Sequence, residues 1–140
     1  MAYFGEYNYT LDSANRLIMP SRYREQLGTE IIIYKSNDGC LFVYDNDNFQ
    51  QILAPLRAYG GTDIGREKLR HFYSDTTPVS IDRNGRLVVP ADCIAHASLK
   101  DEVVILGANN RIEIWDKTIY TERMGDKSML LADDYPDIIF

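Results

Sequence analysis

The chain has 140 residues, of which 45% are hydrophobic and 26% charged, and its formal net charge is −6 at pH 7. This length and composition are typical of a soluble globular protein with one domain, or with one domain built from two small halves. We expect no membrane span, because no apolar run approaches the roughly 20 residues required, and no signal peptide, because the N-terminus lacks a basic start and an apolar core. The acidic balance argues weakly against nucleic acid as a partner.

The acidic charge is distributed unevenly along the sequence. Residues 125–140 contain four aspartates and one lysine, a local net charge of −3, so half of the excess lies in this segment. Residues 10–24 contain one aspartate and three arginines, a local net charge of +2. An acidic chain with locally basic segments can therefore still bind phosphate groups.

The first predicted strand, residues 5–10, leads into a stretch that occurs twice. Residues 10–20 (TLDSANRLIMP) and 80–90 (SIDRNGRLVVP) are identical at Asp, Arg, Leu and Pro, and the pairs Thr/Ser, Leu/Ile, Ile/Val and Met/Val keep their character. Each copy is typical of an apolar strand, a short polar turn with the pattern Asp-x-x-x-Arg, and a second apolar strand that ends at proline. The sequence therefore predicts two tight hairpin turns, one in each half.

The residue types in these turns indicate separate roles. Asp12 and Asp82 can accept hydrogen bonds from backbone N–H groups within the turn. Asn15 and Gly85 share one position, and these two residue types tolerate a positive φ best. We expect these four residues to organise the turns.

Each half then continues with the same elements in the same order. The matched pairs are the short helices 20–27 and 90–97, the buried strands 31–34 and 103–106, and the strands 41–44 and 112–115 that close hairpins with them. Proline is expected at the first helical position, where its missing N–H is not needed. The continuous apolar runs 31–34 and 103–106 are typical of strands buried on both faces.

A further helix is predicted after each hairpin. Asp45 and Asp116 occupy matched positions and can cap these helices. Pro55 is expected to kink or shorten the first of them. Trp115 matches Tyr44 and is expected to anchor the core. The helical stripes are Phe49, Ile52, Leu53 and Leu56 in the first half, and Ile119, Tyr120 and Met124 in the second.

A connector over residues 58–77 joins the halves. Gly60 and Gly61 interrupt it, and Thr62 can cap another helix that runs to Tyr73. After Gly125 the acidic segment has no clear periodicity, and the sequence predicts disorder there.

Enzymatic signatures are scarce. The sequence has neither a Gly-rich phosphate loop nor a His-Glu-x-x-His motif. His71 and His96 are not spaced as metal ligands, and we interpret Cys40 and Cys93 as reduced thiols in or near a core, with neither a disulfide nor a metal implied. We therefore expect no enzymatic activity, no metal site and no cofactor.

The arginines of the two turns are the remaining candidates for function. In one interpretation they only form surface ion pairs with the turn aspartates, which contribute little to stability. In the other, Arg16 and Arg86 make bidentate contacts with phosphates or guanine edges. The second is favoured because both halves keep the arginine although intervening residues differ. Arg22, Arg24 and Arg83 lie close by in sequence and are further candidates for DNA contact.

Over residues 1–124 the sequence resembles the MraZ family of bacterial transcriptional regulators. The duplicated strand–Asp-x-x-x-Arg–strand–Pro unit, the Phe-Tyr-Ser segment at 72–74 and the Glu-Ile-Trp-Asp segment at 113–116 carry this resemblance. It implies a mixed β/α, mainly β fold, an AbrB-like swapped-hairpin (double-split) β-barrel formed by two internal repeats with short helices around it. Asn15 replaces the glycine that is more usual in the family's turn.

The resemblance also implies a domain division and a function. SpoVT-AbrB-like repeats would cover 5–47 and 77–119, with a helical connector at 48–76 and a terminal helix with an acidic tail at 120–140. A ring-like homo-oligomer would bind double-stranded DNA at short direct repeats upstream of its own operon, in the cluster for cell division and cell wall synthesis, in the cytoplasm and on the nucleoid. The alternative is an oligomeric protein-interaction module with the same barrel that does not bind DNA.

Overall fold

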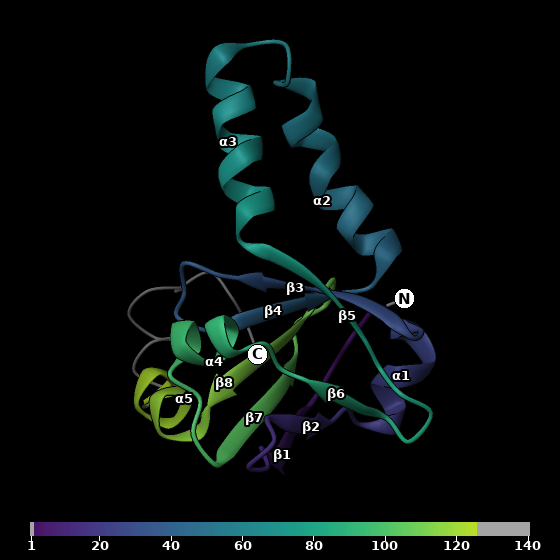
Figure 1. The fold of residues 1–140 in the computed structure, drawn as a ribbon, viewed down its shortest axis with the longest axis vertical. Coiled ribbons are helices and arrows are strands. Elements are labelled where there is room, and N and C mark those ends of the chain that lie inside the picture. The colour runs from purple at the N-terminus through teal and green to yellow at the C-terminus, as the bar shows by residue number, and fades with distance from the viewer. Residues whose placement is uncertain (1, 126–140) are drawn as a thin grey trace, which may run out of the picture.

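The computed structural model describes residues 2–125, so the acidic segment and the disorder predicted for it lie outside the described residues (Figure 1). The fold is mixed α/β. The strands are β1 (Glu6–Thr10), β2 (Arg16–Ile18), β3 (Glu30–Lys35), β4 (Leu41–Tyr44), β5 (Thr76–Ser80), β6 (Arg86–Val88), β7 (Glu102–Gly107) and β8 (Ile112–Asp116). The helices are α1 (Ser21–Leu27), α2 (Asn46–Ala58), α3 (Asp63–Ser74), α4 (Ala91–Ala97) and α5 (Lys117–Met124).

The sheet topology interleaves the two halves of the chain. Six strands form one antiparallel sheet in the order β1-β7-β8-β4-β3-β5, and β2 pairs separately with β6. The predicted hairpins β3–β4 and β7–β8 are both present. Each is extended by the first strand of the other half, β5 beside β3 and β1 beside β7. The order is therefore nearly symmetric about the β4–β8 boundary.

The prediction of two β-hairpins at the Asp-x-x-x-Arg turns is wrong about the pairing of the flanking strands. Both turns form, but β1 pairs with β7 while β2 pairs with β6, so the strands on either side of the first turn have different partners. Leu17 lies opposite Leu87 in the β2–β6 pair, and both are almost fully buried. The strands β2 and β6 are only three residues long, and each alone would bury little apolar surface. Burial of Leu17 and Leu87 is the physical reason why these two strands pair with each other.

One core is shared by both halves, as expected for halves too small to be stable alone. Its main cluster joins side chains of the sheet, such as Ile33 and Ile105, with Leu17 and Leu87 of the β2–β6 pair. Trp115 is 6% exposed and packs against Tyr120, in agreement with its predicted role as a core anchor.

Local capping follows the sequence closely. Asp45, Thr62 and Asp116 each accept a hydrogen bond from a backbone N–H in the first turn of the next helix. Pro20 and Pro90 precede α1 and α4 as N-cap residues, one position earlier than predicted. The helix α2 continues past Pro55 to Ala58, so this proline does not end it.

The helices α2 and α3 form a hairpin that projects from the sheet, at the end of the molecule opposite the β2–β6 pair (Figure 1). Its base is apolar, because Phe49, Leu53 and Phe72 pack together against the sheet. Its outer part exposes Tyr59 and Ile64, which are 63% and 70% accessible. Within residues 2–125, no helix has the length and apolar character needed to cross a membrane.

Candidate nucleic-acid interface

The first Asp-x-x-x-Arg turn is built around the Asp12 carboxylate. One carboxylate oxygen accepts hydrogen bonds from the backbone N–H groups of Ala14 and Arg16, both at 2.9 Å. The other oxygen accepts the side-chain Nε–H of Arg16 at 2.8 Å. Asn15 adopts a φ of 62°, in the left-handed region that the tight reversal requires. The carboxylate thus holds both the backbone of the turn and the orientation of the arginine.

The second turn repeats this arrangement with one difference. The backbone N–H groups of Asn84 and Arg86 donate to one oxygen of Asp82 at 2.8 and 2.9 Å, and Gly85 has a φ of 82°. The Nε of Arg86 lies 3.5 Å from the other oxygen, so this ion pair is longer than the first. The Arg86 side chain is therefore less tightly tied to its aspartate.

Both turn aspartates are held in the ionised state. Hydrogen bonds from the backbone N–H of Arg16 and of Arg86 lower the pKa of Asp12 and Asp82, respectively, below the usual value for aspartate. Each carboxylate therefore remains an acceptor for its arginine at neutral pH. Because Arg16 contacts Asp12 through Nε, the edge formed by its two terminal NH₂ groups can still meet an external acceptor in a bidentate manner.

The two turns lie at opposite ends of the β2–β6 ribbon. The N–H of Met19 donates to the carbonyl of Gly85, and the N–H of Val89 donates to the carbonyl of Asn15, both at 2.8 Å. Each turn is thus bonded to the end of the other half's ribbon strand. The spacing of the two turn arginines is consequently set by the ribbon and does not depend on flexible connections.

One face of this ribbon points away from the core and carries four side chains, Arg16, Ile18, Arg86 and Val88, which we call the ribbon face. Arg16, Ile18 and Val88 are exposed, and Arg86 is half-buried. The intervening Leu17 and Leu87 point inward and are buried. In the antiparallel register Arg16 lies opposite Val88, and Ile18 lies opposite Arg86. The exposed aliphatic residues were not among the sequence-based candidates. The alternation Arg-Leu-Ile and Arg-Leu-Val indicates them once Leu is recognised as the inward residue.

The structure separates the three additional arginines. Arg83 is exposed at the tip of the second turn. Arg24 extends from α1 so that its guanidinium packs against Gly85, which places this arginine of the first half at the turn of the second. The Nε atoms of Arg24 and Arg86 are buried and have no hydrogen-bond partner within residues 2–125. The second turn therefore has three cationic side chains, those of Arg24, Arg83 and Arg86.

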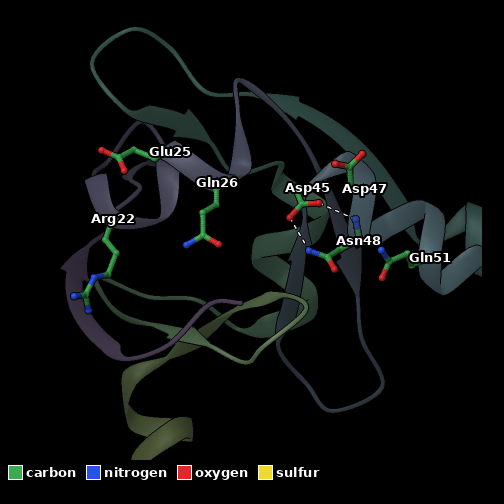
Figure 2. A pocket seen from close by; sticks show the side chains of 7 residues that line it. All are labelled: Arg22, Glu25, Gln26, Asp45, Asp47, Asn48 and Gln51. Atoms are coloured by element: carbon green, nitrogen blue, oxygen red, sulfur yellow. Dashed lines mark hydrogen bonds between the residues drawn. The ribbon is translucent and has the colours of Figure 1, made fainter. Parts of the chain in front are cut away.

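Arg22 lies elsewhere, at the edge of a polar cavity of about 870 Å³ between α1 and the start of α2 (Figure 2). In this cavity Asp45 accepts hydrogen bonds from Asn48 and from the Tyr3 hydroxyl. Figure 2 shows Arg22 pointing away from the pair Asp45 and Asn48, on the side of α1 that carries Glu25 and Gln26. The structure thus does not bring Arg22 to the turns.

The remaining chemically reactive side chains have structural surroundings. Cys40 and Cys93 are buried and unpaired, and burial raises the pKa of their thiols to about 12 and about 11, so both are protonated at neutral pH. His71 is exposed on α3, and Nε2 of His96 lies 2.6 Å from the carbonyl oxygen of Ser36. Within residues 2–125, no group of three or more His, Cys, Asp or Glu residues is placed to hold a metal ion.

Comparison with known proteins places this arrangement in a family. The model of the family described as "MraZ protein, putative antitoxin-like" matches residues 2–64 and 72–130. The chain belongs to the MraZ family. The resemblance drawn from the duplicated turns is thereby confirmed. The matched segments contain both Asp-x-x-x-Arg turns and the whole ribbon face, whereas the short unmatched stretch falls in α3.

Several curated relatives resemble the chain over most of its length. A protein of Clostridium acetobutylicum named "Transcriptional regulator MraZ" is 40% identical over 121 residues, which cover 86% of this chain and 85% of the relative. Relatives with the same name from Finegoldia magna and Acetivibrio thermocellus are 39% and 35% identical, and the alignments cover 96% and 91% of this chain and 94% and 90% of the relatives.

Proposed function

We propose that this protein is a transcriptional regulator that binds double-stranded DNA through the ribbon face and its two turns. The observation that carries the proposal is the position of Arg16, which is exposed, and Arg86, which is half-buried, on one face of a rigid ribbon, each beside an ionised aspartate. The names of the relatives support the regulatory role. By analogy with the family, the target would be short direct repeats upstream of its own operon, in the cluster for cell division and cell wall synthesis.

The shape of the ribbon fits this role. A two-stranded β-ribbon is narrow enough to enter the DNA major groove, where guanine presents two acceptors to an arginine fork. Asp12 fixes the Nε side of the Arg16 guanidinium and leaves the outer NH₂ groups for such a contact or for a phosphate. Arg83 and Arg24 at the second turn would add phosphate contacts, and Arg22 is the weakest candidate because of its place beside the cavity.

We further propose an AbrB-like swapped-hairpin barrel as the architecture, with repeats over 5–47 and 77–119 and a helical connector over 48–76. The interleaved pairings β1–β7, β5–β3 and β2–β6 support it, because in each the strands come from different repeats. In this description the two repeats of one chain supply the halves of a single barrel.

A ring-like homo-oligomer would overcome two weaknesses of a single subunit. One chain presents only a few cations and has a net charge of −6, so its own affinity for DNA would be low. Several ribbon faces bound to spaced repeats would gain avidity without any new type of contact. The exposed apolar side chains of Tyr59 and Ile64 on the α2–α3 hairpin support this proposal, because they could be buried between subunits. The protein would act in the cytoplasm, on the nucleoid, and this function includes no enzymatic step and no cofactor.

The test measures binding of the purified chain to a DNA fragment from upstream of its own gene, by mobility shift at two salt concentrations. Arg16→Ala and Arg86→Ala should weaken binding, and Arg70→Ala should not, because Arg70 lies on α3 and pairs with Glu67 far from the ribbon. A folded and oligomeric Arg16→Ala variant that binds like the wild type would refute the role of Arg16. Absence of binding by the wild type would favour the protein-interaction alternative.

The salt dependence separates the two kinds of arginine contact. Loss of one phosphate contact reduces the slope of log K against log salt concentration by about 0.9, whereas loss of a base contact lowers affinity for the specific site and leaves the slope nearly unchanged. We expect Arg83→Ala to change the slope and Arg16→Ala to change specificity. The same pair of salt concentrations therefore assigns each arginine to phosphates or to bases.

A further inference from the structure

The ribbon face contains two aliphatic side chains in a position where an exposed strand usually carries polar ones. Ile18 is 46% and Val88 is 55% accessible. They occupy matched positions of the two repeats, two residues after each turn arginine. Neither Ile18 nor Val88 packs in the core, where Leu17 and Leu87 fill the space below the ribbon.

The register arranges these side chains in a regular pattern. Opposite residues on one face of an antiparallel pair have their Cβ atoms about 5 Å apart, and successive residues on the same face of a strand are separated by roughly 7 Å. The arginines thus occupy one diagonal of the ribbon face, and Ile18 and Val88 occupy the other. The result is a small apolar strip across the ribbon, with a cation at each side of it.

We propose that Ile18 and Val88 contact the C5-methyl groups of thymines in the major groove and so act as specificity-determining residues. This inference rests on the DNA-binding function proposed above. The partner of the apolar strip follows from charge and chemistry together. The flanking arginines attract a polyanion, and the thymine methyl is the apolar group that DNA presents in its major groove. Same-face residues of one strand lie roughly 7 Å apart, which corresponds to about two base-pair steps, so the four side chains cover about three base pairs.

The test compares two versions of the same fragment from upstream of the gene, one amplified with dTTP and the other with dUTP, which lacks the methyl groups. Binding of the full-length chain is measured by fluorescence anisotropy at a single salt concentration. The wild type should bind the thymine fragment about fourfold more tightly for each contacted methyl group. The double variant Ile18→Ala/Val88→Ala should bind both fragments equally, with the affinity that the wild type has for uracil DNA. Phe4→Ala, an exposed apolar residue that precedes β1 and lies outside both the ribbon face and the α2–α3 hairpin, is the matched control and should discriminate like the wild type.

The outcomes separate this inference from the proposed function. Equal affinity of the wild type for both fragments, or discrimination that persists in the double variant, refutes the methyl contact and leaves DNA binding intact. Absence of wild-type binding to either fragment refutes both. A change in oligomer mass of the double variant, measured by light scattering, assigns the two residues to a subunit contact and overturns the inference. Should the alanine pair not fold, as judged by circular dichroism, Ile18→Thr/Val88→Thr keeps the β-branched shape and should show reduced discrimination.

Discussion

The conformation of the second turn can be tested by the substitution Gly85→Ala. Gly85 has a φ of 82°, where an L-residue with a Cβ is disfavoured by about 1–2 kcal/mol. The added Cβ would also overlap Nη1 and Cζ of the Arg24 guanidinium and lie 2.8 Å from its Nε. The guanidinium is the mobile end of a long side chain, so it would move away at modest cost, and the backbone strain would remain. We expect a loss of about 1–2 kcal/mol, equivalent to a fall in Tm of roughly 3–8 °C for a chain of this size.

Calorimetry or thermal circular dichroism measures this change in Tm, and two further variants serve as controls. Asn15→Gly at the matched position should change stability by less than about 0.5 kcal/mol, because relief of the left-handed φ is offset by the greater backbone entropy of glycine. In an Arg24→Ala background the steric part of Gly85→Ala disappears while the strain persists. A Gly85→Ala variant with the same Tm as its parent in both backgrounds would show that this position does not require the left-handed conformation, and the reasoning would fail.

Three further predictions concern the turns and the sheet. Asp12→Ala should lower both the Tm and the affinity for DNA, because two backbone N–H groups lose their acceptor. Arg16→Ala should lower the affinity for DNA with little change in Tm. Thermal unfolding and mobility shift together distinguish the two variants. The folded-state pKa values of Asp12 and Asp82 lie below the ordinary 3.8. The contribution of these carboxylates to stability is therefore complete above that pH and is lost as the pH falls through the lowered pKa values. The variant Asp12→Asn/Asp82→Asn should consequently show a flatter acid limb in a curve of Tm against pH. Arg111→Ala should cost about 2–3 kcal/mol in urea unfolding, because it leaves the buried Glu113 carboxylate, now 2.7 Å from Arg111 Nη2, without its cation.

The elements of this fold could be predicted from the sequence because their signals are local. Proline and capping residues mark the helix starts, and Asp45 and Asp116 cap as their matched positions indicate. The partners of the strands could not be predicted in the same way. An alternating pattern shows which face of β2 is buried but carries no information on which strand lies beside it. The exchange of β1 and β5 between halves therefore does not follow from the local pattern, although the family resemblance implied a swapped-hairpin arrangement.

The candidate site shows the same division between local and long-range information. The chemistry of the turns is contained within five residues, so the roles of Asp and of Asn or Gly follow from residue type. The location of Arg24 does not, because closeness in sequence suggested the first turn and the fold places it at the second. Ile18 and Val88 were counted as apolar strand residues, and only the burial of Leu17 and Leu87 shows that they face outward.

Duplication within one chain allows the two ends of the ribbon to differ, which a symmetric pair of identical subunits does not permit. The position of Arg24 is taken by Ile94 in the second half. A contact from α4 to the first turn, equivalent to that of Arg24 with the second turn, would therefore bring a neutral side chain there. The second turn has Arg83 and Arg24 in addition to Arg86, whereas the described contacts of the first involve Arg16 alone. A ribbon with a strongly and a weakly cationic end has a direction along the groove. Such a polarity suits the direct repeats proposed here, in which every site has the same orientation, better than a palindrome, which calls for two equivalent ends.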